Sequence, residues 1–441
     1  MVVLLKIVQV ILALSILVLV HEFGHFIFAK MFKIKVEKFY LFFDAGFALF
    51  KFKPKNSDTE YGIGWLPLGG YCKIAGMIDE SMDKEAMKEE PKPWEFRSKP
   101  AWQRFFVMFG GVFFNLILAI LLYSATLFTW GEEYLKNEEA KYGVYVNDLA
   151  YEMGFRNGDK IISFDGVATD NFSNLQIDMV RSQAKEAKVL RGNDTITIAL
   201  DESYIPKALN TPGMFGLAFP FIVGEVPDSS LNASSGLIPG DEIVAINGEE
   251  MFITQEIQKT LQNLKSQTIT ATVLRSGDSL QIPLAVDSVG RIEVMLDGDM
   301  TKIFNITTKS YSLLGSVGAG AKKAWVTTKN YVEELGLIFS PKTEAYKSVG
   351  SFIRIGSIFP STWDWQNFWS ITAWLSIMLA VLNILPIPAL DGGHILFLFY
   401  EIITRRKPSD KFMEIAQMVG MFILFGIMIL AFGNDIISLF R

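Results

Sequence analysis

Near the end of its first apolar segment the chain reads His21-Glu22-Phe23-Gly24-His25. Residues i and i+4 share one face of an α-helix, so His21 and His25 can direct two imidazoles at one metal ion. Glu22 then lies within reach of a water on that metal, as in the H-E-x-x-H zinc signature. The chain contains only 3 histidines, and two of them fall in this motif. Two buried histidines that merely bond their neighbours are therefore the weaker interpretation.

The motif lies in a segment that is long enough to cross a membrane. Residues 2–20 include only three polar side chains, those of Lys6, Gln9 and Ser15. A run of this length and polarity predicts a membrane span. Ionisable residues inside a span are costly unless they serve a site. Because cleavage after this segment would separate the histidines from their helix, we interpret it as a retained span and not as a signal peptide.

The composition indicates a protein that is partly in the membrane and partly outside it. Hydrophobic residues make up 50% of the chain and charged residues 20%. The net charge of −6 is spread over many segments, so no nucleic-acid partner is expected. The single cysteine, Cys72, excludes an intrachain disulfide and is interpreted as a packing residue.

Four apolar segments predict transmembrane helices at residues 1–30, 102–130, 369–400 and 410–435. Residues 31–101, which connect the first two helices, are rich in lysine. Connections rich in lysine and arginine stay in the cytoplasm. Both termini, and the segment between the second and third helices, are then extracytoplasmic.

Within residues 31–101, two stretches predict strands, because aromatic, β-branched and glycine residues alternate in them. They cover residues 39–53 and 61–77, and a polar turn at residues 56–58 joins them. We expect a membrane-associated β-hairpin, which either dips into the membrane or lies on its cytoplasmic surface. Pro67-Leu68-Gly69-Gly70-Tyr71 interrupts the second strand. Residues 79–95 are acidic and rich in lysine, and predict a solvated linker.

Residues 131–220 and 221–290 are predicted to form two copies of one α+β module. A Gly-x-x-x-Gly-Asp pattern begins at Gly154 and recurs 82 residues later at Gly236. The pattern resembles PDZ domains, which add extended peptides or peptide termini as a strand at a sheet edge. A role as a steric filter only is equally open. Residues 291–368 mix apolar, lysine and tryptophan residues, and predict an amphipathic helix on the membrane surface.

The third predicted span reads Asn383-Ile384-Leu385-Pro386-Ile387-Pro388-Ala389-Leu390-Asp391-Gly392-Gly393-His394. Two prolines must break this helix, and broken backbone at membrane depth is tolerated where it lines a cavity. Counted from the outer ends of their spans at about 1.5 Å per residue, His21 and Asp391 lie roughly 26 and 30 Å deep. They can therefore meet. Catalytic zinc takes three protein ligands, and His21, His25 and Asp391 complete such a set.

The predicted chemistry is hydrolysis of a peptide bond with Zn²⁺ as the cofactor. Bound zinc lowers the pKa of its water to about 7, and Glu22 can take that proton and later deliver it to the leaving amine. His394 is a possible fourth ligand, but a closed site would lose its open position for water. We favour a role for His394 behind the ligands or in packing.

The two motifs together resemble those of the site-2 protease family of intramembrane zinc metalloproteases. H-E-x-x-H stands in the first span and N-x-x-P-x-P-x-L-D-G in the third, and the paired modules resemble the bacterial RseP-like branch. The resemblance implies a polytopic α-helical protein of the bacterial inner membrane with two extracytoplasmic PDZ-like domains. It implies single-pass transmembrane substrates, cleaved within the lipid bilayer. The implied processes are regulated intramembrane proteolysis, such as that of an anti-sigma factor, or clearance of signal-peptide remnants, with the modules as a substrate filter.

The resemblance also implies roles for individual residues. Glu22 is the catalytic base, and His21, His25 and Asp391 are the zinc ligands. Three residues of the third span shape the cleft and hold the substrate backbone: Asn383, Pro386 and Pro388. Two glycines belong to the β element that receives unwound substrate: Gly69 and Gly70. Asn115 matches an asparagine of the family's second span.

This sequence departs from the family's pattern at two places. Gly350-Ser351-Phe352 stands where a Gly-Pro pair is common, and Phe164-Asp165-Gly166 stands where Ile-Asn-Gly is usual. A membrane-anchored peptide-binding protein with a structural metal is the alternative function, although a structural zinc would not need Glu22. A metal transporter is weaker, because the four spans show no internal repeat.

Overall fold

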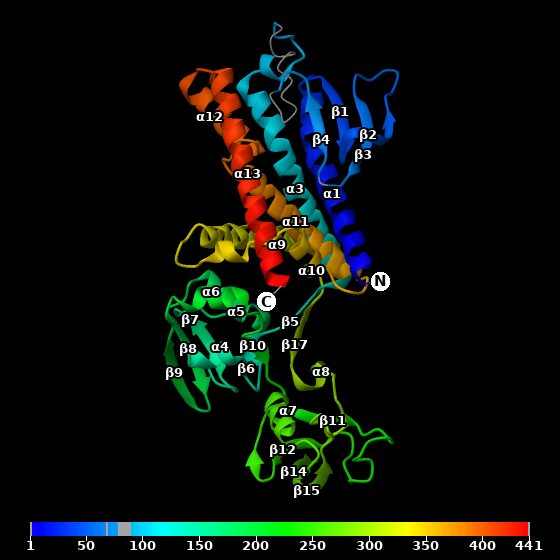
Figure 1. Ribbon diagram of the computed structural model, residues 1–441, viewed down its shortest axis with the longest axis vertical. Helices are drawn as coiled ribbons and strands as arrows, with labels where there is room; N and C mark the ends of the chain where they lie inside the picture. Colours follow the sequence, from blue (N-terminus) through cyan, green and yellow to red (C-terminus); the bar gives the residue numbers. More distant parts are fainter. Residues whose placement is uncertain (1, 68, 78–89, 440–441) are drawn as a thin grey trace. The chain divides into compact units, whose positions relative to one another are not determined.

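The computed structural model describes residues 2–67, 69–77 and 90–439. Leu68 and most of the predicted solvated linker, residues 79–89, lie outside the described residues. The chain divides into two compact units. The membrane unit comprises residues 1–131, 310–336 and 346–441, and the module unit comprises residues 132–309 and 337–345 (Figure 1).

Four helices of the described residues are long and apolar enough to cross a membrane. They are α1 (Val2–Met31), α3 (Ala101–Trp130), α11 (Trp365–Ile384) and α13 (Asp410–Leu439). Many of their large apolar side chains are exposed on the protein surface, as expected for helices that face lipid. The prediction of four apolar spans agrees with these helices.

The third span, predicted for residues 369–400 with a break at its two prolines, consists of two helices. α11 ends before the two prolines, and α12 (Asp391–Thr404) begins after a break at residues 385–390. Pro386 and Pro388 lack the N–H that a continuing helix needs, which explains the break. Asp391 is thus the first residue of a new helix and not a residue within α11.

α1 and α3 approach closely because two glycines face each other. A Cβ atom added to Gly24 would lie 2.2 Å from the carbonyl oxygen of Gly110. Small residues let membrane helices come together in this way. α11 packs against the same pair, and the Ser376 hydroxyl donates a hydrogen bond to the Asn115 carbonyl oxygen at 2.8 Å. The buried contacts among α1, α3 and α11 fix the part of the bundle that carries the motifs.

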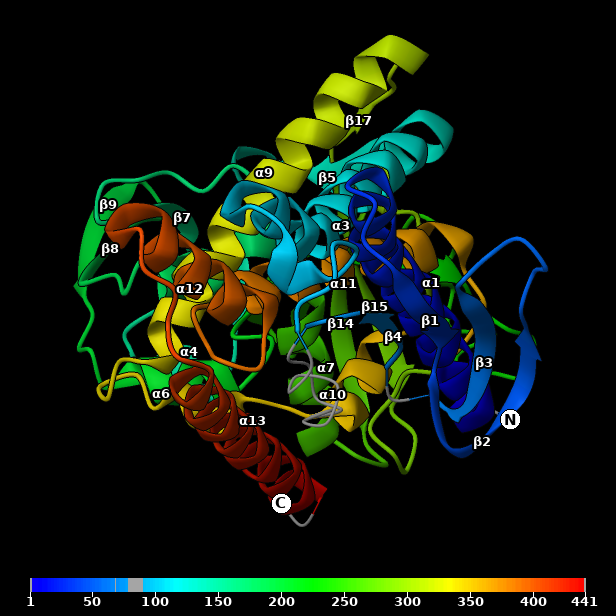
Figure 2. The ribbon, with the colours of Figure 1, turned by 90° about the horizontal axis from the view of Figure 1, so that it is seen from above.

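The predicted hairpin is part of a four-stranded mixed sheet beside α1 (Figure 2). Its strands are β1 (Val36–Leu41), β2 (Phe43–Phe52), β3 (Glu60–Leu66) and β4 (Tyr71–Ile74), in the order β2-β3-β1-β4. β2 and β3 form the expected antiparallel pair. The stretch predicted as one strand over residues 39–53 is divided at Phe42, whose φ of 69° ends β1. Local alternation could not reveal the parallel pairing of β1 with β3, because that register depends on distant residues.

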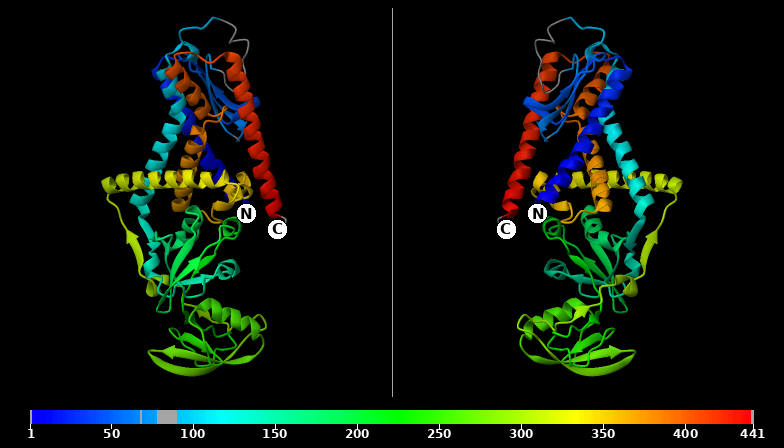
Figure 3. Two further views of the ribbon diagram at one scale, coloured as in Figure 1. Left: turned by 90° about the vertical axis from the view of Figure 1, so that its left-hand side faces the viewer. Right: turned by 90° about the vertical axis from the view of Figure 1, so that its right-hand side faces the viewer.

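One further long helix and three short elements complete the membrane unit. α9 (Leu313–Ile338) crosses α3 and α11 and does not run alongside them (Figure 3). Its buried Ala324 joins an apolar cluster with Ala119 and Tyr123 of α3, while Leu314 and Trp325 are exposed. Its predicted place on the membrane surface stays a prediction. Two 3-10 helices and one α-helix are also present: η1 (Phe96–Ser98), η4 (Ala345–Ser348) and α10 (Phe352–Ile358).

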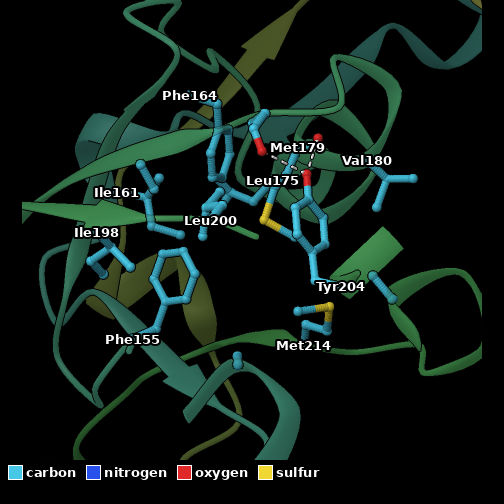
Figure 4. Packing of buried hydrophobic residues seen from close by; sticks show 14 of the residues in the cluster. Phe155, Ile161, Phe164, Leu175, Met179, Val180, Ile198, Leu200, Tyr204 and Met214 are labelled. Atoms are coloured by element: carbon cyan, nitrogen blue, oxygen red, sulfur yellow. Dashed lines mark hydrogen bonds between the residues drawn. The ribbon is translucent and has the colours of Figure 1, made fainter. Parts of the chain in front are cut away.

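The module unit contains two copies of one α+β arrangement. The first copy, called module 1, consists of β6 (Val144–Val146), α4 (Asp148–Glu152), β7 (Lys160–Phe164), η3 (Phe172–Asn174), α5 (Leu175–Arg181), β8 (Glu186–Arg191), β9 (Asp194–Ala199), α6 (Tyr204–Asn210) and β10 (Phe215–Leu217). The second copy, module 2, consists of β11 (Phe221–Glu225), β12 (Glu242–Ile246), β13 (Glu249–Glu250), α7 (Thr254–Asn263), β14 (Thr268–Arg275), β15 (Asp278–Ala285) and β16 (Met295–Leu296). Each copy has its own apolar core, and Figure 4 shows the core of module 1.

The module boundaries differ from those predicted. β5 (Glu132–Leu135), expected inside the first module, pairs instead with β17 (Ile306–Lys309). η2 (Asn137–Glu139) follows β5, and α8 (Met300–Ile303) precedes β17. Module 2 extends beyond residue 290, because β16 pairs with β11. These pairings join segments up to 177 residues apart, so the local repeat pattern could not predict them.

Candidate active site

α1 presents the two histidines of the motif on one buried face. His21 and His25 lie one turn apart, and their Nε2 atoms are 3.3 Å from each other. Both rings face α3 at Gly111, where an added Cβ atom would come within 2.8 Å of atoms of both rings. The imidazoles therefore occupy space that only a glycine on α3 leaves open.

Asp391 reaches the histidines from the start of α12. Its Oδ2 atom lies 3.2 Å from His21 Nε2 and 3.3 Å from His25 Nε2. Gly392 permits this tight return of the chain, because a Cβ atom there would lie 2.2 Å from the Leu385 carbonyl oxygen. The break after α11 thus brings a carboxylate to two imidazoles that precede it by more than 360 residues.

The three side chains fit a zinc ion. Their ligand atoms form a triangle with sides of 3.2, 3.3 and 3.3 Å. Tetrahedral zinc with bonds of about 2.0–2.1 Å separates its ligand atoms by roughly 3.3 Å. The Asp391 Oδ2 atom is buried and has no hydrogen-bond partner among the described residues. A bound cation would satisfy this oxygen, and two imidazoles with one carboxylate suit zinc.

Contacts behind the histidines orient their rings. His25 Nδ1 lies 2.8 Å from the Val107 carbonyl oxygen and donates its proton there, which leaves Nε2 free to bind a metal. The Asn115 side-chain nitrogen Nδ2 lies 3.2 Å from His21 Nδ1, while Asn115 Oδ1 has no hydrogen-bond partner among the described residues. If His21 Nε2 binds a metal, Nδ1 carries the proton, so the amide must present its oxygen to it. Both rings are then held by groups on α3.

A pocket of about 580 Å³ opens beside these three residues. Glu22 lines it, and Gly70 lies next to Glu22, since a Cβ atom on Gly70 would be 3.6 Å from Glu22 Cγ. Asn383 of α11 also lines the pocket. Three other residues predicted to bind substrate are not among its lining residues: Gly69, Pro386 and Pro388. Pro388 instead packs against α13, where its carbonyl oxygen meets Gly420.

The sheet contributes polar pocket residues that the sequence did not single out. Asp44 lines the pocket, accepts a hydrogen bond from the Tyr71 hydroxyl at 2.9 Å and pairs with Lys38 at 3.1 Å. Although burial acts to raise the pKa of Asp44, these two partners lower it, so the carboxylate is ionised at neutral pH. No local motif marks these residues, because they converge only when β1, β2 and β4 pair.

His394 and Cys72, which were also interpreted from the sequence, line the pocket as well. His394 lines it but does not belong to the group of three whose ligand atoms lie within 4.8 Å of one another. A metal held by the other three residues would therefore keep its fourth position open. Burial raises the pKa of the Cys72 thiol well above its ordinary value, which fits an inert packing residue.

The fold and the site together define a class of protein. Three side chains that could hold a metal ion, with a carboxylate beside them, are the arrangement expected of a metal-dependent hydrolase, and here they lie among apolar helices long enough to cross a membrane. The family model of peptidase family M50 matches residues 9–427. The chain belongs to this family, the site-2 proteases, and is a zinc metallopeptidase of the site-2 type.

Similar proteins match the chain over nearly its whole length. A candidate zinc metalloprotease of Neisseria meningitidis is 29% identical, over 97% of this chain and 98% of its own. Protease RseP of Yersinia pestis is 27% identical, over 96% and 97% of the two chains. A PDZ domain of an SdrC-like protein from Listeria monocytogenes is 21% identical over 18% of this chain, with a TM-score of 0.17. The last value is too low to decide the fold of the modules.

Proposed function

We propose that this chain hydrolyses peptide bonds within the transmembrane segments of single-pass membrane proteins. In this proposal His21, His25 and Asp391 hold zinc, and Glu22 is the general base. The triangle of ligand atoms beside Glu22, inside an apolar bundle, is the observation that supports it most directly. Relatives named as zinc metalloproteases and as RseP support the same reaction.

In the proposed reaction, the residues of the site have different roles. Zinc, when bound, polarises the scissile carbonyl and acidifies water. Glu22 takes a proton from the attacking water and returns it to the nitrogen of the leaving amine. Val107 and Asn115 keep the two imidazoles oriented, so that Glu22 faces the pocket from a fixed helix.

We further propose that the substrate lies as an extended strand along β4. A helical substrate hides its carbonyl groups in its own hydrogen bonds, so the stretch to be cut must first unwind. β4 is at the end of its sheet, with β1 as its only strand partner among the described residues. An edge strand can pair with an extended peptide. Gly70 and Tyr71, at the start of β4, line the pocket with Glu22, and Asn383 holds the substrate from α11.

Charge supports a proposed orientation in the inner membrane. The many lysines of residues 31–101 support a cytoplasmic location for this connection and its sheet. Both termini and the module unit are then extracytoplasmic. We propose that the modules act there as a substrate filter, which admits proteins whose outer domains have been removed.

The proposal is tested by replacing Glu22 with glutamine. Glu22→Gln keeps the shape of the side chain but cannot take a proton, and general-base catalysis is worth about 10²–10⁴ in rate. We expect the purified variant to bind zinc like the wild type and to lose cleavage of a tagged single-span substrate by at least about 10²-fold. If the variant cleaves at the wild-type rate with its zinc intact, Glu22 is not the base.

A further inference from the structure

A single polar side chain interrupts the apolar sequence of α13. Between Glu414 and Asn434, Gln417 is the only residue that is neither apolar nor glycine. An amide within a membrane span is costly unless it has a partner or serves a site. The reaction proposed above gives Gln417 no role.

Gln417 faces the active-site pocket. Its side chain is only 5% exposed, and among the described residues it is the one member of α13 that lines the pocket with Glu22. Gly420 follows one turn later on the same face of the helix and lies against Pro388, because a Cβ atom there would overlap the Pro388 carbonyl group. This contact holds α13 against the broken segment that precedes Asp391. α13 thus adds one amide to the pocket.

Two amides of the pocket have hydrogen-bonding groups that the protein leaves unused. The charged side chains of Lys38 and Asp44 bond to each other. Asn383 and Gln417 are the two amide side chains that line the pocket, and neither has a hydrogen-bond partner among the described residues. An amide supplies both a donor and an acceptor, and a peptide group is a ligand that offers both in return. An extended polypeptide backbone therefore complements this pair of amides.

Other glutamines of the chain show how such an amide is satisfied. Gln9, the other buried glutamine of the described residues, donates from Nε2 to the Pro360 carbonyl oxygen at 3.1 Å. Gln176 of α5 donates to the Ala208 carbonyl oxygen at 2.8 Å and accepts the N–H of Met214 at 3.0 Å. In both cases the partner is the backbone of another segment of the chain. The amide that α13 adds to the pocket lacks such a partner within the described chain.

We propose that Gln417 is a substrate-binding residue, whose amide binds the backbone of the unwound substrate beside the bond to be cut. Nε2 donates to a substrate carbonyl oxygen, and Oε1 accepts a substrate N–H. Every residue except proline offers both groups, so this contact does not depend on the substrate sequence. Asn383 of α11 and Gln417 of α13 then hold the extended stretch from two different helices. The inference rests on the proposed function, because it concerns the same substrate.

Substrate binding is measured first without cleavage, in the full-length Glu22→Gln variant in detergent. A fluorescently labelled single-span substrate reports its binding by anisotropy. Adding Gln417→Met keeps the length of the side chain and removes both hydrogen-bonding groups. One hydrogen bond corresponds to about fivefold in affinity, so we expect binding to weaken at least about fivefold. Adding Met418→Leu instead, at the more exposed neighbouring position, is the control and should leave binding unchanged.

Cleavage by the single variant Gln417→Met then separates binding from packing. Loss of substrate binding raises KM and leaves kcat unchanged. We expect KM to rise at least about fivefold, with the zinc content of the wild type. Gln417→Asn keeps the amide and should recover part of the loss. A fall in zinc content or in kcat at unchanged KM would assign Gln417 to packing of the metal site and overturn the inference.

Cross-linking locates the substrate independently of these rates. In full-length protein with Glu22→Gln and Cys72→Ser, either Gln417→Cys or the control Met418→Cys is oxidised with substrates that carry one cysteine at successive positions of the span. We expect Gln417→Cys to form a disulfide only within about three residues of the cut, roughly 10 Å of extended chain, and Met418→Cys to form none. No disulfide from Gln417→Cys, or the same pattern from both, overturns the inference. The protease proposal stands in that case as long as the wild type cleaves, whereas a wild type that does not cleave refutes both.

Discussion

Buried carboxylates occur in both units, but their oxygens are satisfied in different ways. In the modules, Asp159 and Asp241 are fully buried. Each accepts two hydrogen bonds from an arginine, Arg191 or Arg275, at 2.7–2.9 Å. Each also accepts a backbone N–H, at 2.8 or 2.9 Å. In the membrane unit, the buried Oδ2 atom of Asp391 lies 3.2 and 3.3 Å from two histidine nitrogens and has no hydrogen-bond partner in the described part of the chain.

The difference separates structural carboxylates from a candidate ligand. A carboxylate whose oxygens are all bonded within the protein gains nothing from a cation, and it serves the stability of its fold. An oxygen that is buried and unbonded costs free energy until something else binds it. Burial alone therefore does not identify a site. Among these three carboxylates, the unbonded oxygen distinguishes Asp391 as the candidate ligand.

Replacing Asp391 should give the largest effect. Asp391→Asn removes the charge that the triangle of ligand atoms needs, so we expect zinc binding to weaken by about 10²-fold or more and cleavage to fall below detection. Metal content of the purified protein measures this. Asp241→Asn is the control, because its carboxylate is buried but fully bonded within module 2, and it should keep both zinc and cleavage. Equal zinc loss in both variants would contradict the comparison.

For the stability of module 2, in contrast to zinc binding, we expect Asp241→Asn to have the larger effect and Asp391→Asn to have none. Asp241→Asn breaks a bidentate pair with Arg275, and hydrogen bonds to charged groups contribute about 1.5–3 kcal/mol each. We expect module 2 to lose about 2–3 kcal/mol of stability. Hydrogen exchange followed by mass spectrometry reports this in peptides from residues 221–296 of the full chain. The same peptides should be unchanged in Asp391→Asn, and a change there would mean that the two units are coupled.

A smaller effect is expected at the glycine that faces the histidines. Gly111→Ala places a methyl group within 2.8 Å of atoms of His21 and His25, so the rings must shift. We expect zinc affinity to fall by about 10- to 100-fold, as for changes behind metal ligands. Gly426→Ala is the control, because nothing lies within 4 Å of a Cβ atom at that position of α13. Zinc titration in the presence of a competing chelator measures both variants.

The smallest expected effect is a loss of stability of module 2 at low pH. The hydrogen bonds from Arg275 lower the pKa of Asp241 below its ordinary value of about 3.9. A lowered pKa in the folded state stabilises the fold above the ordinary pKa, and that contribution is lost as the pH falls through the lowered value. We expect hydrogen exchange in module 2 to accelerate below about pH 4 in the wild type and less so in Asp241→Asn. Equal acceleration in both would assign the acid sensitivity to other groups.

The local sequence was sufficient to predict features that depend on residues close together in the chain. Helical spacing paired His21 with His25, apolar length predicted four spans, and two prolines predicted the break before Asp391. The repeated Gly-x-x-x-Gly-Asp pattern predicted two similar modules. The use of His21, His25 and Asp391 as zinc ligands stays a proposal. Their ligand atoms nevertheless lie close together, as expected from the similar depths of His21 and Asp391 in their predicted spans.

Other features depend on contacts between distant residues. Gly111 meets the histidine rings only because α3 crosses α1 there, and Asp44 reaches the pocket only because β2 and β4 belong to one sheet. Residues 204–214 of module 1 are the clearest case, because Gln176 bonds their backbone. Gln176 and Gln258 occupy the same position of the repeat, but one binds its own chain and the other lines an open groove.

The sequence by itself therefore determined the spans, the repeat and the residue types available for chemistry, because each of these follows from spacing along one helix or one strand. Only the tertiary structure decided which carboxylate lacks a partner and which module has an open groove. Whether a buried polar atom is satisfied depends on every group packed around it, and those groups come from segments far apart in the chain.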